Sequence, residues 1–237
     1  SSLTDSLLRG KPDNQSVEYS TRVNWINEIF DVTTKPLIFD ADNGGRIEHI
    51  RYIVSSLERI GASAIIIEDK IGLKKNSLFQ NQKNVEQDNI NNFSKKISAA
   101  KKSCVSDDFL IIARIESFIL GKSLEDAIRR AEAYSKAGAD AILIHSKEKT
   151  PNEIFRFAKK FSKSKHYKPM VCVPSTYSHV HEKKLIDYGF KIVIYANHMM
   201  RSSYPSMVNI AKNILRAKRS SVIENKISSV KEMIDLI

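Results

Sequence analysis

The chain has 237 residues, of which 42% are hydrophobic and 27% are charged. This length suits a single α/β domain with one sizeable core, and no run of residues approaches the roughly 18 consecutive apolar positions of a membrane span. The first residues also lack the basic-then-apolar order of a secretory signal. We therefore expect a cytoplasmic protein with no membrane partner.

The net charge of +11 raises the question of a nucleic-acid partner, because clustered lysines neutralise backbone phosphates. The lysines are instead scattered along predicted helices, and the sequence has no recognition-helix, zinc-finger or RNP-like pattern. We expect no nucleic-acid partner and interpret the basic surface as one that steers an anionic substrate. Cys104 and Cys172 lack metal-ligand spacing, and we predict that both are inert thiols.

Short apolar runs rich in β-branched residues alternate with longer stretches of helical period. This alternation is typical of a parallel sheet covered by helices. The predicted strands, in chain order, are residues 36–39, 64–67, 109–113, 141–144, 170–173 and 190–195.

Helical periodicity and capping signals predict the helices between these strands. Apolar residues recur on one face of residues 47–60. Ser123 is the predicted N-cap of one helix, and Thr150 is that of another, with Glu153 as its capping-box acid. Further helices are predicted for residues 23–30, 203–216 and 222–237.

Polar residues follow every predicted strand directly, which separates two possible architectures. A doubly wound sheet would collect its ligand mainly at one switch point, whereas a TIM-type (β/α)8 barrel assembles its site from many strand ends. We therefore predict the barrel. The polar residues at the strand ends are Asp40, Asp42, Glu68, Asp69, Arg114, Glu116, His145, Ser146, Pro174, Ser175, Asn197 and His198.

A barrel of this type needs eight strands, and the pattern predicts six. Residues 1–3 are expected to be the end of another strand followed by a loop. On this interpretation the chain lacks the first βα unit and most of the second strand. Residues 1–217 are assigned to the catalytic barrel, and residues 218–237 to a C-terminal helical extension.

Asp40 and Asp42 lie one residue apart at a strand end, and Glu68 ends the next strand. Carboxylate oxygens suit Mg²⁺, and several acids at one rim would be costly without a cation. The sequence therefore predicts a magnesium site formed by these three residues. The alternative for Asp42 is that it caps the following helix.

Arg114 ends an apolar strand, so its guanidinium is expected in the mouth of the barrel, where it suits a carboxylate or phosphoryl group. The alternative is an internal ion pair with Glu116 or Glu68. His145 could be a hydrogen-bond donor, an acid or a satisfied core histidine. The long polar segment that starts at residue 68 is either a lid over the site or a plain surface loop.

Six motifs occur in an order and spacing that resemble the phosphoenolpyruvate mutase family of the isocitrate lyase superfamily, over essentially the whole chain. An ordered match of this kind is far more specific than any single motif. The motifs are DADNGG (40–45), EDKIGLKKNS (68–77), ARIES (113–117), AGADAILIHS (137–146), VPS (173–175) and YANHMMR (195–201).

The resemblance implies a role for each matching residue. Asp40 is implied as the direct Mg²⁺ ligand, with Asp42 and Glu68 holding metal-bound waters. Asp13 matches the catalytic aspartate, and Arg114 matches a substrate-binding position that also serves catalysis. The other implied residues are Lys74, Asn76 and Ser77 of the gating loop, Ser1, Ser2 and Leu3 around the phosphonyl group, and the substrate-binding His145.

Three departures from the family pattern bear on the activity. Ser2 replaces a common glycine, DAD continues as Asn-Gly-Gly rather than Thr-Gly-Tyr-Gly, and the gating loop has no cysteine. The missing cysteine removes the usual acid of the lyases and argues against an isocitrate or methylisocitrate lyase.

The resemblance implies a Mg²⁺-dependent isomerase that interconverts phosphoenolpyruvate and 3-phosphonopyruvate. The alternatives are a phosphonopyruvate hydrolase and a non-catalytic scaffold. A small phospho- or phosphono-carboxylate is the implied ligand. The resemblance also implies that terminal helices are exchanged between the subunits of a homodimer or homotetramer.

Overall fold

The computed structural model describes residues 1–72, 74–78, 82 and 85–236. These residues form two compact units, Ser1–Ala196 and Asn197–Ile237. The larger unit contains all of the strands, and the smaller unit is helical. The predicted boundary lay after residue 217, at the other end of helix α8 (His198–Ala217).

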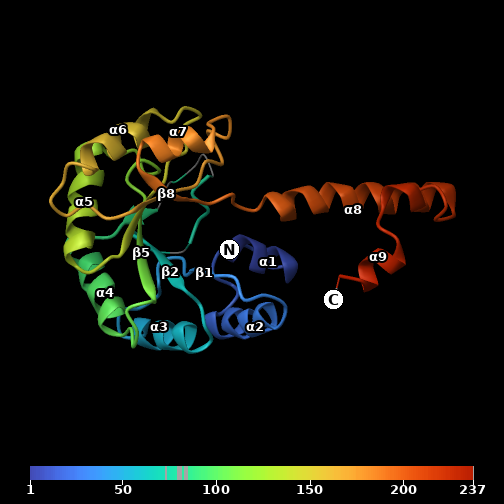
Figure 1. Cartoon of the computed structure of the whole chain (residues 1–237), viewed down its shortest axis with the longest axis horizontal. Coiled ribbons are helices and arrows are strands. Elements are labelled where there is room, and N and C mark those ends of the chain that lie inside the picture. Colours follow the sequence, from blue (N-terminus) through green and yellow to red (C-terminus); the bar gives the residue numbers. More distant parts are fainter. Residues whose placement is uncertain (73, 79–81, 83–84, 237) are drawn as a thin grey trace. The chain divides into compact units, whose positions relative to one another are not determined.

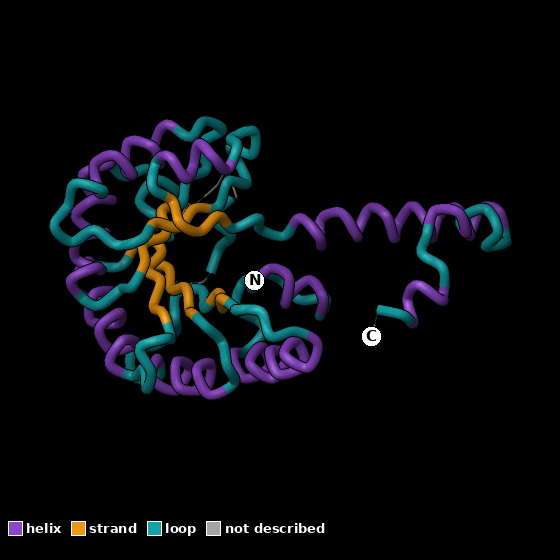
Figure 2. Tube along the Cα trace, viewed as in Figure 1, coloured by secondary structure: helices purple, strands orange, loops and turns teal. Residues whose placement is uncertain are grey.

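The larger unit is built on a parallel sheet of six strands in the order β1-β2-β5-β6-β7-β8. The sheet curls into one side of a barrel, and helices pack along its outside (Figure 1, Figure 2). Each predicted strand is confirmed, with bounds β1 Ile38–Asp40, β2 Ala64–Glu68, β5 Leu110–Ile115, β6 Ala141–Ile144, β7 Met170–Cys172 and β8 Phe190–Val193.

The pleat of the strands separates two apolar clusters, because successive side chains point to opposite faces of a sheet. In β2, Ile65 packs with the residues that face the helices, whereas Ile66 packs in the cluster inside the curled sheet. Glu68 lies two residues beyond Ile66 and therefore also faces inside. Its register partner on β5 is Arg114, so the two charged groups lie at the same level of the barrel.

The helices of the outer layer bury their apolar faces against the sheet. Helix α3 (Ile50–Arg59) buries three apolar residues in the periodicity predicted for residues 47–60. Helix α5 (Leu124–Lys136) begins at the predicted N-cap Ser123, whose hydroxyl accepts a hydrogen bond from the Asp126 N–H at 3.2 Å. The other helices of this layer are α2 (Tyr19–Val32), α4 (Ile90–Lys102), α6 (Asn152–Phe161) and α7 (Glu182–Asp187).

Two predictions about local structure are wrong, one for residues 1–3 and one for the N-cap of α6. Residues 1–3 do not end a strand, because the backbone folds locally into helix α1 (Ser2–Leu8), where the Asp5 N–H donates to the Ser1 carbonyl at 3.0 Å. Thr150 does not cap α6, which begins after Pro151 without a side-chain cap. The expected capping-box acid, Glu153, instead accepts a hydrogen bond from the Ser146 hydroxyl at 2.6 Å.

In the smaller unit, helix α8 holds no buried residue. The single helix predicted for residues 222–237 is wrong, because the chain forms a 3-10 turn, η1 (Glu224–Lys226), and then a separate short helix, α9 (Val230–Ile234). Ser229 and Glu232 form a capping box that starts α9 afresh.

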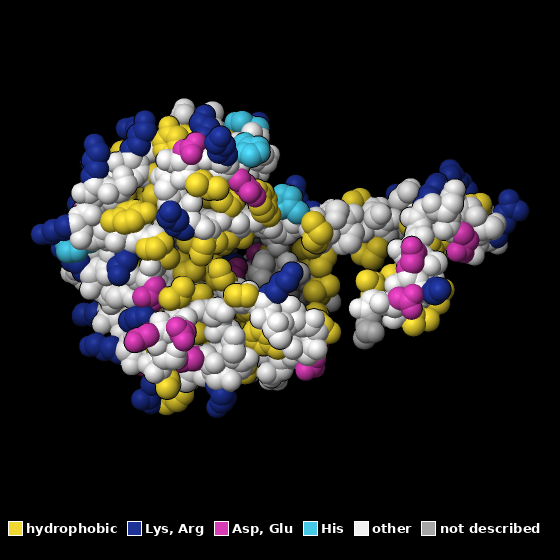
Figure 3. Space-filling view, in the orientation of Figure 1, with side chains coloured by type: hydrophobic (Ala, Val, Ile, Leu, Met, Phe, Trp, Pro, Cys, Tyr) yellow, Lys and Arg dark blue, Asp and Glu magenta, His cyan; other side chains and the backbone are white. Residues whose placement is uncertain are grey.

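Two expectations from composition concern membrane-spanning segments and the distribution of the basic residues. No helix among the described residues combines the length and the apolar character that a membrane crossing requires. On the visible face of the larger unit, lysine and arginine side chains are spread around the periphery rather than gathered into one patch (Figure 3).

Candidate active site

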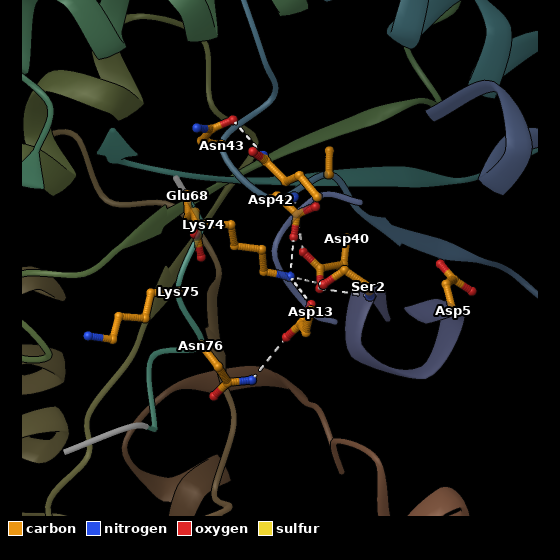
Figure 4. A network of polar contacts seen from close by, with 12 residues as sticks. Ser2, Asp5, Asp13, Asp40, Asp42, Asn43, Glu68, Lys74, Lys75 and Asn76 are labelled. Atoms are coloured by element: carbon orange, nitrogen blue, oxygen red, sulfur yellow. Dashed lines mark hydrogen bonds and ion pairs between the residues drawn. The ribbon is translucent and has the colours of Figure 1, made fainter. Parts of the chain in front are cut away.

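The carboxyl end of β1 meets the start of α1, and the two together hold Asp40. Its Oδ2 accepts hydrogen bonds from the Ser2 backbone N–H at 3.3 Å and from the Ser2 hydroxyl at 3.0 Å. Its Oδ1 accepts from the N–H of Asp42 at 3.2 Å. The three side chains therefore lie within one small group (Figure 4).

The turn that follows Asp42 is tight because it packs against β2. Gly44 has a φ of +73°, and a Cβ atom there would lie 2.9 Å from Cγ2 of Ile67. Asp42 itself has a φ of 52°, in the left-handed region that non-glycine residues rarely adopt. The alternative role of Asp42 as a helix cap is wrong, since His49 occupies the N-cap of α3.

Two residues of the loop that follows the short strand β3 (Lys70–Ile71) reach into this group of acids. The ammonium of Lys74 lies 2.6 Å from Oδ1 of Asp13 and 2.5 Å from Oδ1 of Asp42, and it also donates to the Ser2 hydroxyl. Asn76 donates from Nδ2 to Oδ2 of Asp13 at 3.2 Å (Figure 4). The loop thus brings Lys74 and Asn76 to Asp13, more than 60 residues away in sequence.

A second group forms around Arg114 on the inner face of β5. Its Nε donates to Oε1 of Glu116 at 2.6 Å, and its Nη2 lies 3.4 Å from Oε2 of Glu68. Nη2 also donates to the Ser77 hydroxyl and contacts Nδ1 of His145, each at 2.9 Å. The internal ion pair with Glu116 is therefore present, while the 16% exposure of the Arg114 side chain leaves part of it accessible to a ligand.

The contacts of His145 indicate its tautomer. Nδ1 lies 2.9 Å from Nη2 of Arg114 and 3.2 Å from Oε1 of Glu116. A guanidinium only donates, so the shorter contact requires Nδ1 to accept, and the proton of a neutral ring then lies on Nε2. Burial and the charge of Arg114 lower the pKa of His145, which favours this neutral form. His145 is thereby suited to donate a hydrogen bond from Nε2.

The carboxylates of the site differ in how easily they ionise. Burial opposes the ionised form of Asp40, but the charges of Lys74 and Arg114 outweigh burial and hold its pKa well below its usual range. Burial and the charge of Asp40 raise the pKa of Asp42. Burial, opposed by Arg114, raises the pKa of Glu68 to about 7. Asp42 and Glu68, two of the three predicted metal ligands, are therefore buried acids. Their positively charged neighbours do not bring the pKa back to its ordinary value.

This imbalance bears on whether the residues fit Mg²⁺. The described side chains do not form a ready group of three or more metal-ligating residues, and the Lys74 ammonium lies against Asp42. The donor set nevertheless consists of carboxylate oxygens, which hard cations prefer. A divalent cation beside Asp42 and Glu68 would favour their ionised forms. The chemistry of the donor set therefore fits Mg²⁺.

The structure adds three charged residues to which the sequence assigned no catalytic, substrate-binding or metal-binding role. Glu116 is fully buried between Arg114 and Lys70, and Lys70 is itself 4% exposed. Arg22 of α2 donates to the Asp40 carbonyl at 2.5 Å and lies 3.4 Å from Oδ2 of Asp42. The ARIES and EDK motifs contain Glu116 and Lys70, whereas the only sequence signal for Arg22 is a charge within a helical pattern.

Ser1 and Leu3 flank Ser2 at the start of α1, where Ser1 is the N-cap residue. The contacts with Asp40 come from the N–H and hydroxyl of Ser2. Ligand binding by Ser1, Ser2 and Leu3 stays a prediction.

The family model of phosphoenolpyruvate phosphomutase matches residues 1–215. The chain belongs to the phosphoenolpyruvate phosphomutase family. It is 37% identical over 237 residues to phosphoenolpyruvate phosphomutase of Tetrahymena pyriformis, covering 100% of this chain and 78% of that protein. It is also 37% identical over 227 residues to phosphonopyruvate hydrolase of Variovorax sp. (strain Pal2), covering 95% of this chain and 77% of the hydrolase.

Solved structures give the same result for the fold. The crystal structure of phosphoenolpyruvate phosphomutase from Streptomyces platensis subsp. rosaceus has a TM-score of 0.93 and 33% identity, covering 100% of this chain and 81% of that one. Phosphonopyruvate hydrolase in complex with oxalate and Mg²⁺ has a TM-score of 0.90 and 35% identity, with coverage of 100% and 80%. The predicted fold and family are confirmed, and mutase and hydrolase relatives are similar to the chain at nearly the same level.

Proposed function

We propose that this protein is a phosphoenolpyruvate mutase, which interconverts phosphoenolpyruvate and 3-phosphonopyruvate reversibly with Mg²⁺. The observation that carries the proposal is the convergence of Lys74 and Asn76 on Asp13 beside Asp40. A loop held over the site in this way excludes water, and water is the reactant that separates hydrolysis from isomerisation.

In this reaction the phosphoryl group leaves the enol oxygen of phosphoenolpyruvate and bonds to C3 of the same pyruvate. One P–O bond breaks and one P–C bond forms, and no atom is gained or lost. Phosphoryl transfer passes through a loose, metaphosphate-like state whose charge lies on three oxygens. In the proposed reaction, Ser2, Lys74 and Arg114 stabilise that charge, with Ser1 and Leu3 as further predicted donors.

The remaining residues divide between the metal, the pyruvate part and the transferred group. Asp40, with Asp42 and Glu68 through water, would hold Mg²⁺, which when bound supplies positive charge that stabilises an enolate. His145 can donate from Nε2 to the pyruvate part of the substrate. Asp13 either traps the phosphoryl group covalently or lines its path.

The test is incubation of the full chain with 3-phosphonopyruvate and Mg²⁺, followed by ³¹P NMR. The mutase produces phosphoenolpyruvate as the first phosphorus-containing product. Inorganic phosphate and pyruvate as first products, with no phosphoenolpyruvate, would assign the chain to phosphonopyruvate hydrolysis, the activity named for the Variovorax relative. Asp40→Ala serves as the inactive control.

Calorimetric titration with Mg²⁺ separates an enzyme from a non-catalytic scaffold. We expect binding by the wild-type chain and none by Asp40→Ala, because this substitution removes the implied direct ligand. Equal and negligible binding by both proteins would contradict the metal site and favour the scaffold.

We also propose that the protein is a cytoplasmic homodimer or homotetramer. Helix α8 exposes large apolar side chains, including Met199 at 80%, Tyr204 at 68% and Leu215 at 67%. Exposed apolar residues on one long helix support an interface with another subunit. Light scattering coupled to size-exclusion chromatography measures the oligomeric state, and a monomer at micromolar concentration would contradict this proposal.

A further inference from the structure

We propose that Lys70 is a positioning residue that latches the gating loop over the active site. The inference rests on the proposed function for its effect on catalysis, but the latch itself is a property of the loop. Lys70 begins the short strand β3 (Lys70–Ile71), two positions after Glu68, which ends β2. Its side chain is 4% exposed and points into the protein rather than into solvent.

The ammonium of Lys70 contacts both the loop and the strand ends. It donates to the Lys75 carbonyl at 2.8 Å and to the Ser77 hydroxyl at 2.8 Å. It also lies 3.4 Å from Oε1 of Glu68 and 3.4 Å from Oε2 of Glu116. One buried cation therefore holds the backbone and a side chain of the loop against two carboxylates of the barrel.

The hydrogen bonds of Ser77 show how the latch closes. Its hydroxyl oxygen accepts from Lys70 Nζ at 2.8 Å and from Arg114 Nη2 at 2.9 Å. Both lone pairs are then occupied, so the single hydroxyl proton is directed to Oε2 of Glu116 at 2.5 Å. Without the ammonium, the Ser77 hydroxyl loses one of its two hydrogen-bond donors. The backbone carbonyl of Lys75 loses the hydrogen bond that the ammonium donates to it.

The backbone that carries Lys70 is held on two sides, which makes it a firm anchor. The neighbouring Asp69 N–H donates to the Arg114 carbonyl at 3.1 Å, and the Asp88 N–H donates to the Asp69 carbonyl at 2.7 Å. Lys70 also pairs with Gln87 in an antiparallel ladder. The loop residues that reach Asp13 begin only four positions later, so their placement depends on how the segment after Lys70 is fastened.

A purely structural role is the competing explanation, in which Lys70 only neutralises Glu68 and Glu116. The two roles predict different results for Lys70→Met, which keeps the length of the side chain and removes its charge. A counterion would alter stability alone. A latch would also change the accessibility of the loop and the fate of the phosphoryl group.

Limited proteolysis with trypsin tests the latch independently of any activity. Peptide bonds after Lys74 and Lys75 lie within the loop, and mass spectrometry identifies cleavage there. We expect Lys70→Met to raise the cleavage rate at these bonds about tenfold or more, because at least one charge-assisted hydrogen bond to the loop is lost. Lys160→Met, which removes an exposed lysine paired with Glu125, is the matched control and should leave the loop cleavage unchanged.

The catalytic readout is the ratio of inorganic phosphate to phosphoenolpyruvate formed from phosphonopyruvate. A loosened loop admits water, so Lys70→Met should raise this ratio about tenfold relative to wild type. Because Lys70 and Ser77 share one hydrogen bond, the double variant Lys70→Met/Ser77→Ala should raise loop cleavage by less than the product of the two single-variant effects.

Unchanged loop cleavage in a folded Lys70→Met protein would overturn the latch. If Lys70→Met does not fold, Lys70→Gln replaces it, because glutamine also removes the ammonium but keeps a polar side chain beside the buried carboxylates. Wild-type loop cleavage in a folded Lys70→Gln protein would then overturn the latch. Failure of the wild-type chain to form phosphoenolpyruvate would contradict the proposed function while leaving the cleavage result interpretable.

Discussion

Asp69→Asn is expected to destabilise the larger unit strongly, because Asp69 is the centre of a buried polar network beneath the site. Its Oδ1 accepts from the Glu116 N–H at 3.0 Å, and its Oδ2 accepts from Arg130 at 3.1 Å, Tyr134 at 2.8 Å and Gln87 at 2.8 Å. The Asp69 side chain is fully buried. Asparagine keeps the shape but removes the charge and replaces one acceptor with a donor that faces other donors.

The magnitude follows from these contacts. Removing one partner of a buried ion pair costs about 3–5 kcal/mol. For a unit of this size, each kcal/mol shifts Tm by about 2–4 °C, so the variant should melt about 6–20 °C below wild type. Differential scanning calorimetry measures the change, with the exposed Asp107→Asn as the matched control. A decrease of less than about 2 °C would refute the assignment of Asp69 as a structural centre.

Three further predictions concern the turn, the loop and pH. Gly44→Ala should lower the free energy of unfolding, measured by urea titration, by about 1–3 kcal/mol. The reason is that Gly44 has a φ of +73° and that the new Cβ would lie 2.9 Å from a side-chain atom. An unchanged free energy of unfolding would contradict the tight turn. Asn76→Ala should raise the share of inorganic phosphate among the products seen by ³¹P NMR by about tenfold. Substitution of the exposed Asn24 by alanine is the control and should leave this share unchanged. Equal product ratios in Asn76→Ala and wild type would argue against a role of Asn76 in excluding water. Burial works against the ionisation of Asp126, but hydrogen bonds from Ser117 and Arg130 lower its pKa, so its stabilising contribution should be lost as the pH falls below the ordinary value of 3.8. Thermal unfolding across that range should show a smaller pH dependence in Asp126→Asn than in wild type, and identical profiles would contradict the depressed pKa.

Much of the site follows from short-range patterns. The apolar runs predict the strands, and the residues directly after them predict which side chains reach the carboxyl end of the sheet. Asp40 and Arg114 both follow apolar strand residues by two positions, so the pleat places their side chains on the inner face. Recognition of the ordered motifs added the loop residues Lys74 and Asn76, which no periodicity in the sequence indicates.

Several features could not be predicted because they depend on contacts between distant segments. Residues 1–3 were expected in a strand, and the contact that holds Ser2 at Asp40 involves a partner 38 positions away. Arg22 resembles any other charged helical residue in sequence, yet it is 3% exposed and pairs with Asp5 and Asp42. Such a burial is visible only when the neighbouring elements are in place.

The sequence by itself determined the parallel α/β architecture, the strand ends that face inside and the family, because each is carried by local period or by motifs. Only the tertiary structure decided how the charges are shared at those strand ends. It placed Glu116 between Arg114 and Lys70, and it joined Lys74 to Asp13 across 61 positions. The physical reason is that the pleat and helical periods act over two to four residues, whereas electrostatic pairing in a buried site acts across elements that meet only after folding.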